Sequence, residues 1–141
     1  MEALRRVGVG PGNYMMPHAG SPAAMKDPAF KEKWEKGPRA FMIVMGKGAS
    51  MGKSLVLWFL YCLVVGVFAA YVAGRAVGPG AEYLSVFRFA GTTAFVGYTL
   101  ALWQNSIWYQ IKLSTTIKST VDGLIYALLT AGAFGWLWPN G

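Results

Sequence analysis

The stretch LVLWFLYCLVVGVFAAYVAG, residues 55–74, decides the fold class of this 141-residue chain. Its 20 residues carry no charged side chain, and as an α-helix they would span about 30 Å, the hydrocarbon thickness of a bilayer. The core helix of a soluble bundle usually keeps a polar face, whereas this stretch is apolar around its whole circumference. We therefore predict a transmembrane helix over residues 55–75.

Two more apolar stretches follow, and both lie within the length range of membrane spans. The first, residues 84–110, is interrupted by Arg88, and the second, residues 120–138, contains Asp122 and stops at Pro139. The whole chain is 55% hydrophobic and only 13% charged, which is far from the composition of a soluble domain. The sequence predicts an all-α integral membrane protein with three transmembrane helices.

The distribution of basic residues predicts the orientation of these helices. Nine Lys and Arg residues precede residue 55, and Lys112 and Lys118 follow the second predicted span. Arg75 and Arg88 are the basic residues near the opposite membrane face. Because positively charged segments stay in the cytoplasm, we expect the N-terminus in the cytoplasm and, after three crossings, the C-terminus outside.

The segment before the first span ends like a phosphate-binding loop, since Gly52, Lys53 and Ser54 match the last three positions of that motif. The first glycine of the motif falls on Lys47, however. Without a glycine at that position the backbone N–H groups do not form the cradle that holds a phosphate. We interpret residues 38–54 as a basic interfacial linker.

The N-terminal segment changes character at Asp27. Residues 1–26 are rich in Gly and Pro and are expected to be an extended or disordered tail. Asp27 can cap a helix that a Gly-Pro pair closes, which predicts a short amphipathic cytoplasmic helix over residues 27–37. Phe30 and Trp34 lie four residues apart on one face of this helix, so we take them as candidates for docking a partner or the membrane surface.

Each predicted span carries small residues at spacings of three or four. In lipid the hydrophobic effect does not drive helices together, so a smooth ridge matters because it lets two helix backbones approach closely. We expect these ridges to form the helix-packing faces of the protein. Their members are Cys62, Gly66, Ala70 and Gly74 in the first span, Ala90, Ala94, Gly97 and Ala101 in the second, and Gly123, Ala127, Ala131 and Gly135 in the third.

Two ionisable residues enter the predicted spans, and intramembrane charges are functional candidates by default. Arg88 lies near the outer end of the second span and Asp122 near the inner end of the third. Because these spans run antiparallel, the two charges should lie at opposite membrane faces and are not expected to pair. Gln104 and Asn105 make the inner end of the second span polar, which marks a candidate docking point for a partner.

The sequence offers no catalytic constellation. The sole histidine, His18, lies in the N-terminal tail, so no predicted span supplies the usual imidazole ligand for haem or a chlorophyll-type pigment. The Ser and Thr residues within residues 112–120 have no His or Lys base built nearby. We therefore predict a protein that is not an enzyme and that holds no metal and no cofactor.

The stretches KDPAFKEKWEKGPRAF, MGKSLVLWFLYCLVVGVFAAYVAGRAV and TVDGLIYALLTAGAFGWLWP together resemble small, functionally uncharacterised bacterial membrane proteins. The resemblance lies in their general character and includes no motif of known activity. It implies a multi-pass protein of the bacterial inner membrane and assigns a function to no residue.

Ridged spans without catalytic groups indicate a non-catalytic accessory, structural or assembly subunit of a larger membrane complex, with respiratory and photosynthetic assemblies as candidate hosts. The expected partners are membrane lipids and other integral membrane subunits or a second copy of the chain. No nucleic acid is expected, since Lys and Glu alternate in the N-terminal segment. A homo-oligomeric small transporter or channel, and a lipid- or cofactor-binding membrane module, are the alternatives.

Overall fold

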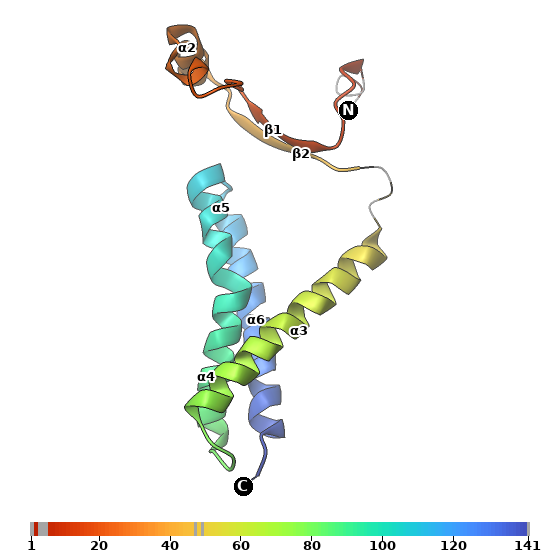
Figure 1. Cartoon of the computed structure of the whole chain (residues 1–141), viewed down its shortest axis with the longest axis vertical. Coiled ribbons are helices and arrows are strands. Elements are labelled where there is room, and N and C mark those ends of the chain that lie inside the picture. Colours follow the sequence, from red (N-terminus) through yellow and green to blue (C-terminus); the bar gives the residue numbers. More distant parts are fainter. Residues whose placement is uncertain (1, 3–5, 47, 49, 141) are drawn as a thin grey trace. The chain divides into compact units, whose positions relative to one another are not determined.

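The structure is a computed structural model that describes residues 2, 6–46, 48 and 50–140 (Figure 1). The chain forms two compact units, of which the first ends at Met51 and the second begins at Gly52. We call them the N-terminal unit and the helical unit and describe each by itself.

The N-terminal unit contains a two-stranded antiparallel sheet and a short helix. Strand β1 (Gly12–Met16) pairs with strand β2 (Ala40–Val44), in a register that sets Gly12 opposite Val44 and Met16 opposite Ala40. A 3₁₀ turn, η1 (Ala24–Lys26), precedes helix α2 (Pro28–Lys36). The Asp27 side chain caps α2 by accepting a hydrogen bond from the Ala29 N–H at 2.9 Å.

The sheet corrects the all-α prediction for the N-terminal unit. We expected residues 1–26 to be an extended or disordered tail and residues 38–54 to be an interfacial linker, yet the structure pairs a strand from each. The sequence AFMIV of β2 is apolar, with aromatic and β-branched residues that suit a pleated strand. Its partner strand lies far away in the sequence, on the other side of α2, so no local signal indicated the pairing.

The helical unit contains three helical runs. Helix α3 spans Met51–Ala76 and helix α6 spans Leu113–Leu137. Between them, α4 (Tyr83–Phe95), a π-helical segment η2 (Val96–Leu100) and α5 (Ala101–Tyr109) follow one another without a break. In the described part of the chain, α3 and α6 are long and apolar enough to cross a membrane by length and composition.

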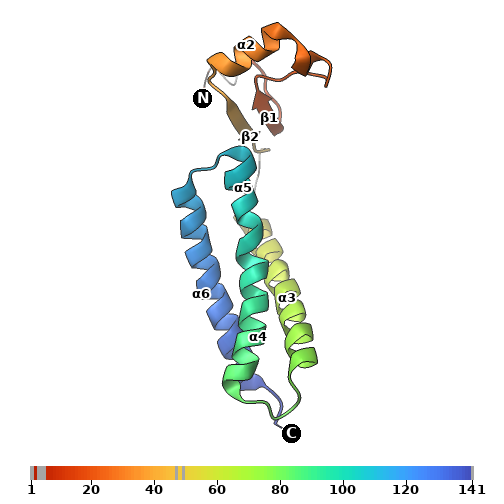
Figure 2. The same ribbon diagram turned by 90° about the vertical axis from the view of Figure 1, so that its left-hand side faces the viewer.

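Helices α4 and α6 pack closely along their small residues, and α4 runs between α6 and α3 in Figure 2. Ala90 and Ala94 of α4 are buried, as are Ala127 and Ala131 of α6. Gly91 faces α6 so closely that a Cβ placed on it would lie 2.8 Å from the Ala131 Cβ. Two of the three predicted ridges therefore contribute to the same helix-helix interface.

The second half of the middle ridge is placed differently from our expectation. Gly97 is exposed, although a Cβ on it would lie 3.2 Å from Val65 of α3, and Ala101 is exposed. A π-helical turn holds more residues than an α-helical turn, so it rotates the residues that follow it around the helix axis. The ridge consequently leaves the α6 interface within η2 (Val96–Leu100).

Helix α3 packs through a neighbouring stripe and not along its predicted ridge. The residues of α3 buried in the described structure are Val65, Ala69 and Ala73. They meet two clusters, one with Ala94, Tyr98 and Ala127 and the other with Ala90. Small residues lie on two adjacent stripes of α3, and the sequence did not indicate which stripe the other helices contact.

The predicted ridge of α3 lies at the edge of this contact and beyond it. Cys62 packs against the first cluster and Gly66 is half-buried, whereas Ala70 and Gly74 are exposed. Within the described residues, a Cβ on Gly66 or Gly74 would meet no other atom within 4 Å. Because four residues advance slightly more than one turn, a stripe with this spacing winds gradually away from the face where it begins.

Candidate functional site

Four aromatic side chains from three helical segments meet in the helical unit. Trp58 and Tyr61 belong to α3, Tyr98 to η2 and Tyr126 to α6. The ring centroid of Tyr98 lies 5.8 Å from that of Tyr61, 5.8 Å from that of Tyr126 and 6.4 Å from that of Trp58. These distances lie within the range of favourable aromatic pairs, with Tyr98 at the centre of the cluster.

The π-helical segment positions the central ring. The Tyr61 hydroxyl donates a hydrogen bond of 2.5 Å to the Gly97 carbonyl oxygen, which joins α3 to η2. The Thr99 hydroxyl donates a hydrogen bond of 2.6 Å to the Phe95 carbonyl oxygen one turn earlier, and Thr99 is fully buried. π-Helical turns interrupt the regular hydrogen-bond ladder of a helix, and side-chain donors of this kind satisfy carbonyls there.

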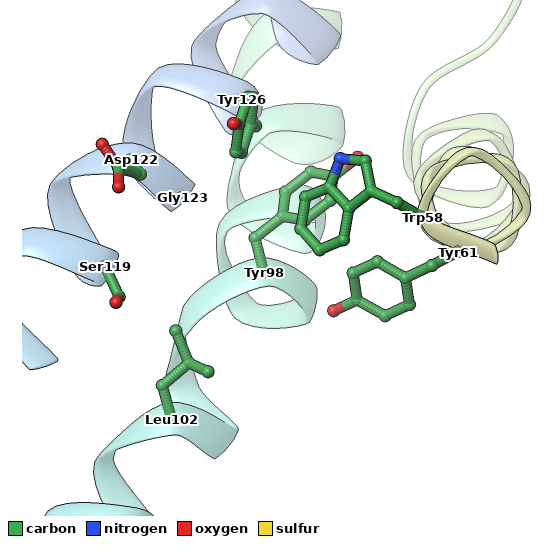
Figure 3. Close-up of a pocket in the computed structure, with 8 residues that line it drawn as sticks. All are labelled: Trp58, Tyr61, Tyr98, Leu102, Ser119, Asp122, Gly123 and Tyr126. Carbon is green, nitrogen blue, oxygen red and sulfur yellow. The ribbon is translucent and has the colours of Figure 1, made fainter. Parts of the chain in front are cut away.

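The aromatic side chains line one wall of a cavity of about 470 Å³ (Figure 3). Leu102 and the α6 residues Ser119, Asp122 and Gly123 complete the lining. In Figure 3 the rings of Trp58 and Tyr61 approach from α3, while Ser119 and Asp122 belong to α6 on the opposite side of the view, and the Asp122 carboxylate points away from these two rings. Trp58 and Tyr61 belong to the N-terminal half of α3, the half that diverges from α4 and α6 in Figure 1.

Part of this aromatic surface is free to meet a ligand. Tyr98 is only 9% exposed, whereas Trp58, Tyr61 and Tyr126 are 45%, 38% and 41% exposed. Buried Tyr98 thus supports three rings that remain open. A pocket of this size, mostly apolar with a few polar groups, is typical of a small-molecule site.

The two charged residues within the predicted spans line separate cavities. Asp122 lines the aromatic cavity, and Arg88 lines another of about 290 Å³ between α4 and α6. The second cavity has walls of Phe87, Gly91 and Leu124, among other residues. Arg88 and Asp122 are thus not brought together.

The polar candidates at the end of the middle run lie beside the turn into α6. Gln104 is exposed and Asn105 is half-buried. The Asn105 carbonyl oxygen accepts the Gln110 N–H as α5 ends. Nearby, the hydroxyl groups of Ser106 and Thr116 share a hydrogen bond of 2.5 Å that ties α5 to α6. These contacts therefore hold the end of α5 against the start of α6.

The predicted docking residues of the N-terminal unit pack against each other. The Phe30 and Trp34 ring centroids lie 5.9 Å apart, and both side chains are half-buried. The Arg39 guanidinium lies 5.3 Å from the centroid of the Trp34 ring, within the range of a cation-π contact. In the described residues, no group of three or more His, Cys, Asp or Glu side chains could hold a metal ion.

Most residues of the aromatic cavity were not indicated by the sequence. Trp58 and Tyr61 are three apart, and Asp122 and Tyr126 are four apart, so each pair shares a helix face. These spacings were available signals. The direction of Tyr98 was not, because it depends on the π-helical segment that contains it.

Comparisons of the chain with protein-family models, with curated proteins and with solved structures found no match. The site must therefore be interpreted from its own chemistry.

Proposed function

We propose that this chain is an integral membrane protein with three crossings and a cytoplasmic N-terminus, and that it serves as a non-catalytic accessory or assembly subunit of a larger membrane complex. The proposed location is the bacterial inner membrane. Two long apolar helices, α3 and α6, support membrane association. The distribution of Lys and Arg supports the orientation.

The proposed third crossing consists of α4, η2 and α5. These segments contain 13, 5 and 9 residues and follow one another without a loop, which is long enough to span a bilayer. Arg88 is the single charged residue in this run. In Figure 2 the run lies beside α6 over most of its length, as expected of two antiparallel spans joined by a short turn.

The observation that carries the subunit role is the free surface of α3. The most apolar 18-residue stretch of α3 has a mean hydropathy of 2.4, and only 11% of this stretch is buried. Gly66, Ala70 and Gly74 form a smooth ridge on this surface, while the small residues of α4 and α6 pack against each other. A small-residue ridge with open space above it suits the close approach of a helix from another membrane protein.

The test compares two faces of α3 in the full chain. We expect Gly66→Leu and Gly74→Leu to block a partner helix, because each places a large side chain on the ridge. Val64→Leu is the matched control, since Val64 is 53% exposed on a different side of α3 and gains only a methylene group. Native mass measurement after mild detergent extraction should show a complex that both glycine variants lose and the control keeps.

The measured mass also identifies the kind of partner. A particle containing a different polypeptide supports the accessory role, whereas a multiple of 15.3 kDa identifies the homo-oligomer of the transporter alternative. A single chain of 15.3 kDa extracted at native expression would contradict the proposal. Equal assembly of all variants would show that this ridge is not the contact surface.

A further inference from the structure

We propose that the aromatic cavity binds a ligand through an ammonium group that carries alkyl substituents. The first argument is the density of rings. Trp58, Tyr61 and Tyr126 are exposed, and the Trp58 ring centroid lies 5.4 Å from that of Tyr61 and 5.8 Å from that of Tyr126. A cation is attracted to an aromatic face within about 6 Å of its centroid, so one cation here can approach several rings.

Charge is the second argument. Asp122 is the only residue with a formal charge among the described residues that line the cavity, in a chain whose net charge is +7. The ion pairs found in the described residues, Arg6–Glu2 and Lys36–Glu32, do not involve it. Asp122 thus lines the cavity and has no ion-pair partner among the described residues. This arrangement favours a cation over a neutral or anionic ligand.

The third argument concerns the kind of cation. A bare metal ion requires several oxygen, nitrogen or sulfur ligands at once, whereas this lining has one carboxylate and is otherwise aromatic, aliphatic or hydroxyl-bearing. An alkylated ammonium group is large, weakly hydrated and apolar at its surface, which suits aromatic walls. The cavity of about 470 Å³ leaves room for a substituent beyond the charged group.

The same chemistry is found in free organic cations and in the headgroups of choline lipids. Choline is therefore a suitable probe, and its uncharged carbon analogue 3,3-dimethyl-1-butanol is the matched control for shape. We expect saturable binding of choline to the full chain in maltoside, measured by titration calorimetry. The uncharged analogue should bind at least about 10-fold more weakly, because cation-π and carboxylate attraction act on charge.

Substitutions assign the binding to this cavity. Asp122→Asn and Trp58→Leu should each weaken choline binding by roughly 5- to 20-fold, as expected for the loss of one partly desolvated charge or cation-π contact. Glu82→Gln and Trp136→Leu remove an acid and an exposed Trp outside this lining, and they should leave binding unchanged.

Lipid composition distinguishes the two sources of the cation. If the natural ligand is a lipid headgroup, phosphatidylcholine nanodiscs should suppress binding of added choline, whereas phosphatidylglycerol nanodiscs should not. Equal choline binding in both would identify a free cation as the ligand. The proposal is overturned if choline shows no saturable binding, if the uncharged analogue binds equally well, or if Asp122→Asn and Trp58→Leu bind choline as the wild type does.

Discussion

The hydroxyl of Tyr61 on α3 donates a hydrogen bond of 2.5 Å to the carbonyl oxygen of Gly97 in the π-helical segment. A Cβ on Gly97 would lie only 3.2 Å from Val65, so the absence of a side chain at this position allows α3 to approach closely. The bond and the close approach occur on one side of η2, and together they fix α3 at the edge of the aromatic cavity.

Removing this hydrogen bond should loosen α3. We expect Tyr61→Phe to lower the free energy of unfolding by about 1 kcal/mol, since the Gly97 carbonyl loses its side-chain donor. Tyr71→Phe is the control because Tyr71 is 64% exposed on the same helix. Unfolding in mixed detergent, followed by tryptophan fluorescence, gives the free energy of unfolding of both variants. Equal stability of the two variants would show that the bond contributes nothing.

The glycines of the helical unit should differ sharply in their tolerance of alanine. Gly91→Ala places a Cβ 2.8 Å from that of Ala131, a rigid neighbour, and should lower the free energy of unfolding by roughly 1–3 kcal/mol. Gly74→Ala meets no atom within 4 Å in the described chain and should be neutral or raise the stability by up to about 1 kcal/mol. The same fluorescence assay checks both, and similar losses would contradict the α4–α6 packing.

The proposed topology predicts which loops a membrane-impermeant thiol reagent reaches in intact cells. In a Cys62→Ser background, Pro79→Cys and Asn140→Cys should be labelled from outside. Met45→Cys and Ile111→Cys should react only after the membrane is opened, because three crossings place them in the cytoplasm. Labelling of Ile111→Cys in intact cells would exclude the middle crossing.

The cap of α2 can be tested in the full chain by hydrogen exchange. Asp27→Ala removes the acceptor of the 2.9 Å bond from the Ala29 N–H. The variant should lower the protection of the amides in the first turn of α2 against hydrogen exchange by about 1 kcal/mol. Asp27→Asn keeps a side-chain oxygen and should preserve most of that protection. Identical exchange in the two variants would mean that the cap does not stabilise the helix.

Several features of the fold could be predicted from local sequence because their causes are local. The uncharged run from Leu55 to Gly74 requires an apolar environment whatever surrounds it, and α3 covers it completely. Asp27 followed by Pro28 specifies a helix start, and α2 begins at Pro28. The pairing of β1 with β2 was missed because hydrogen bonds between distant segments leave no periodic signal.

The sequence by itself determined that long apolar helices form, because hydrophobicity and backbone hydrogen bonding act within each segment. Only the tertiary structure decided which small residues meet. Val65, Ala69 and Ala73 pack while Ala70 and Gly74 stay exposed, since helix contact depends on rotation about each axis. The π-helical turn sets that rotation for Tyr98, and with it the aromatic cavity that Asp122 also lines.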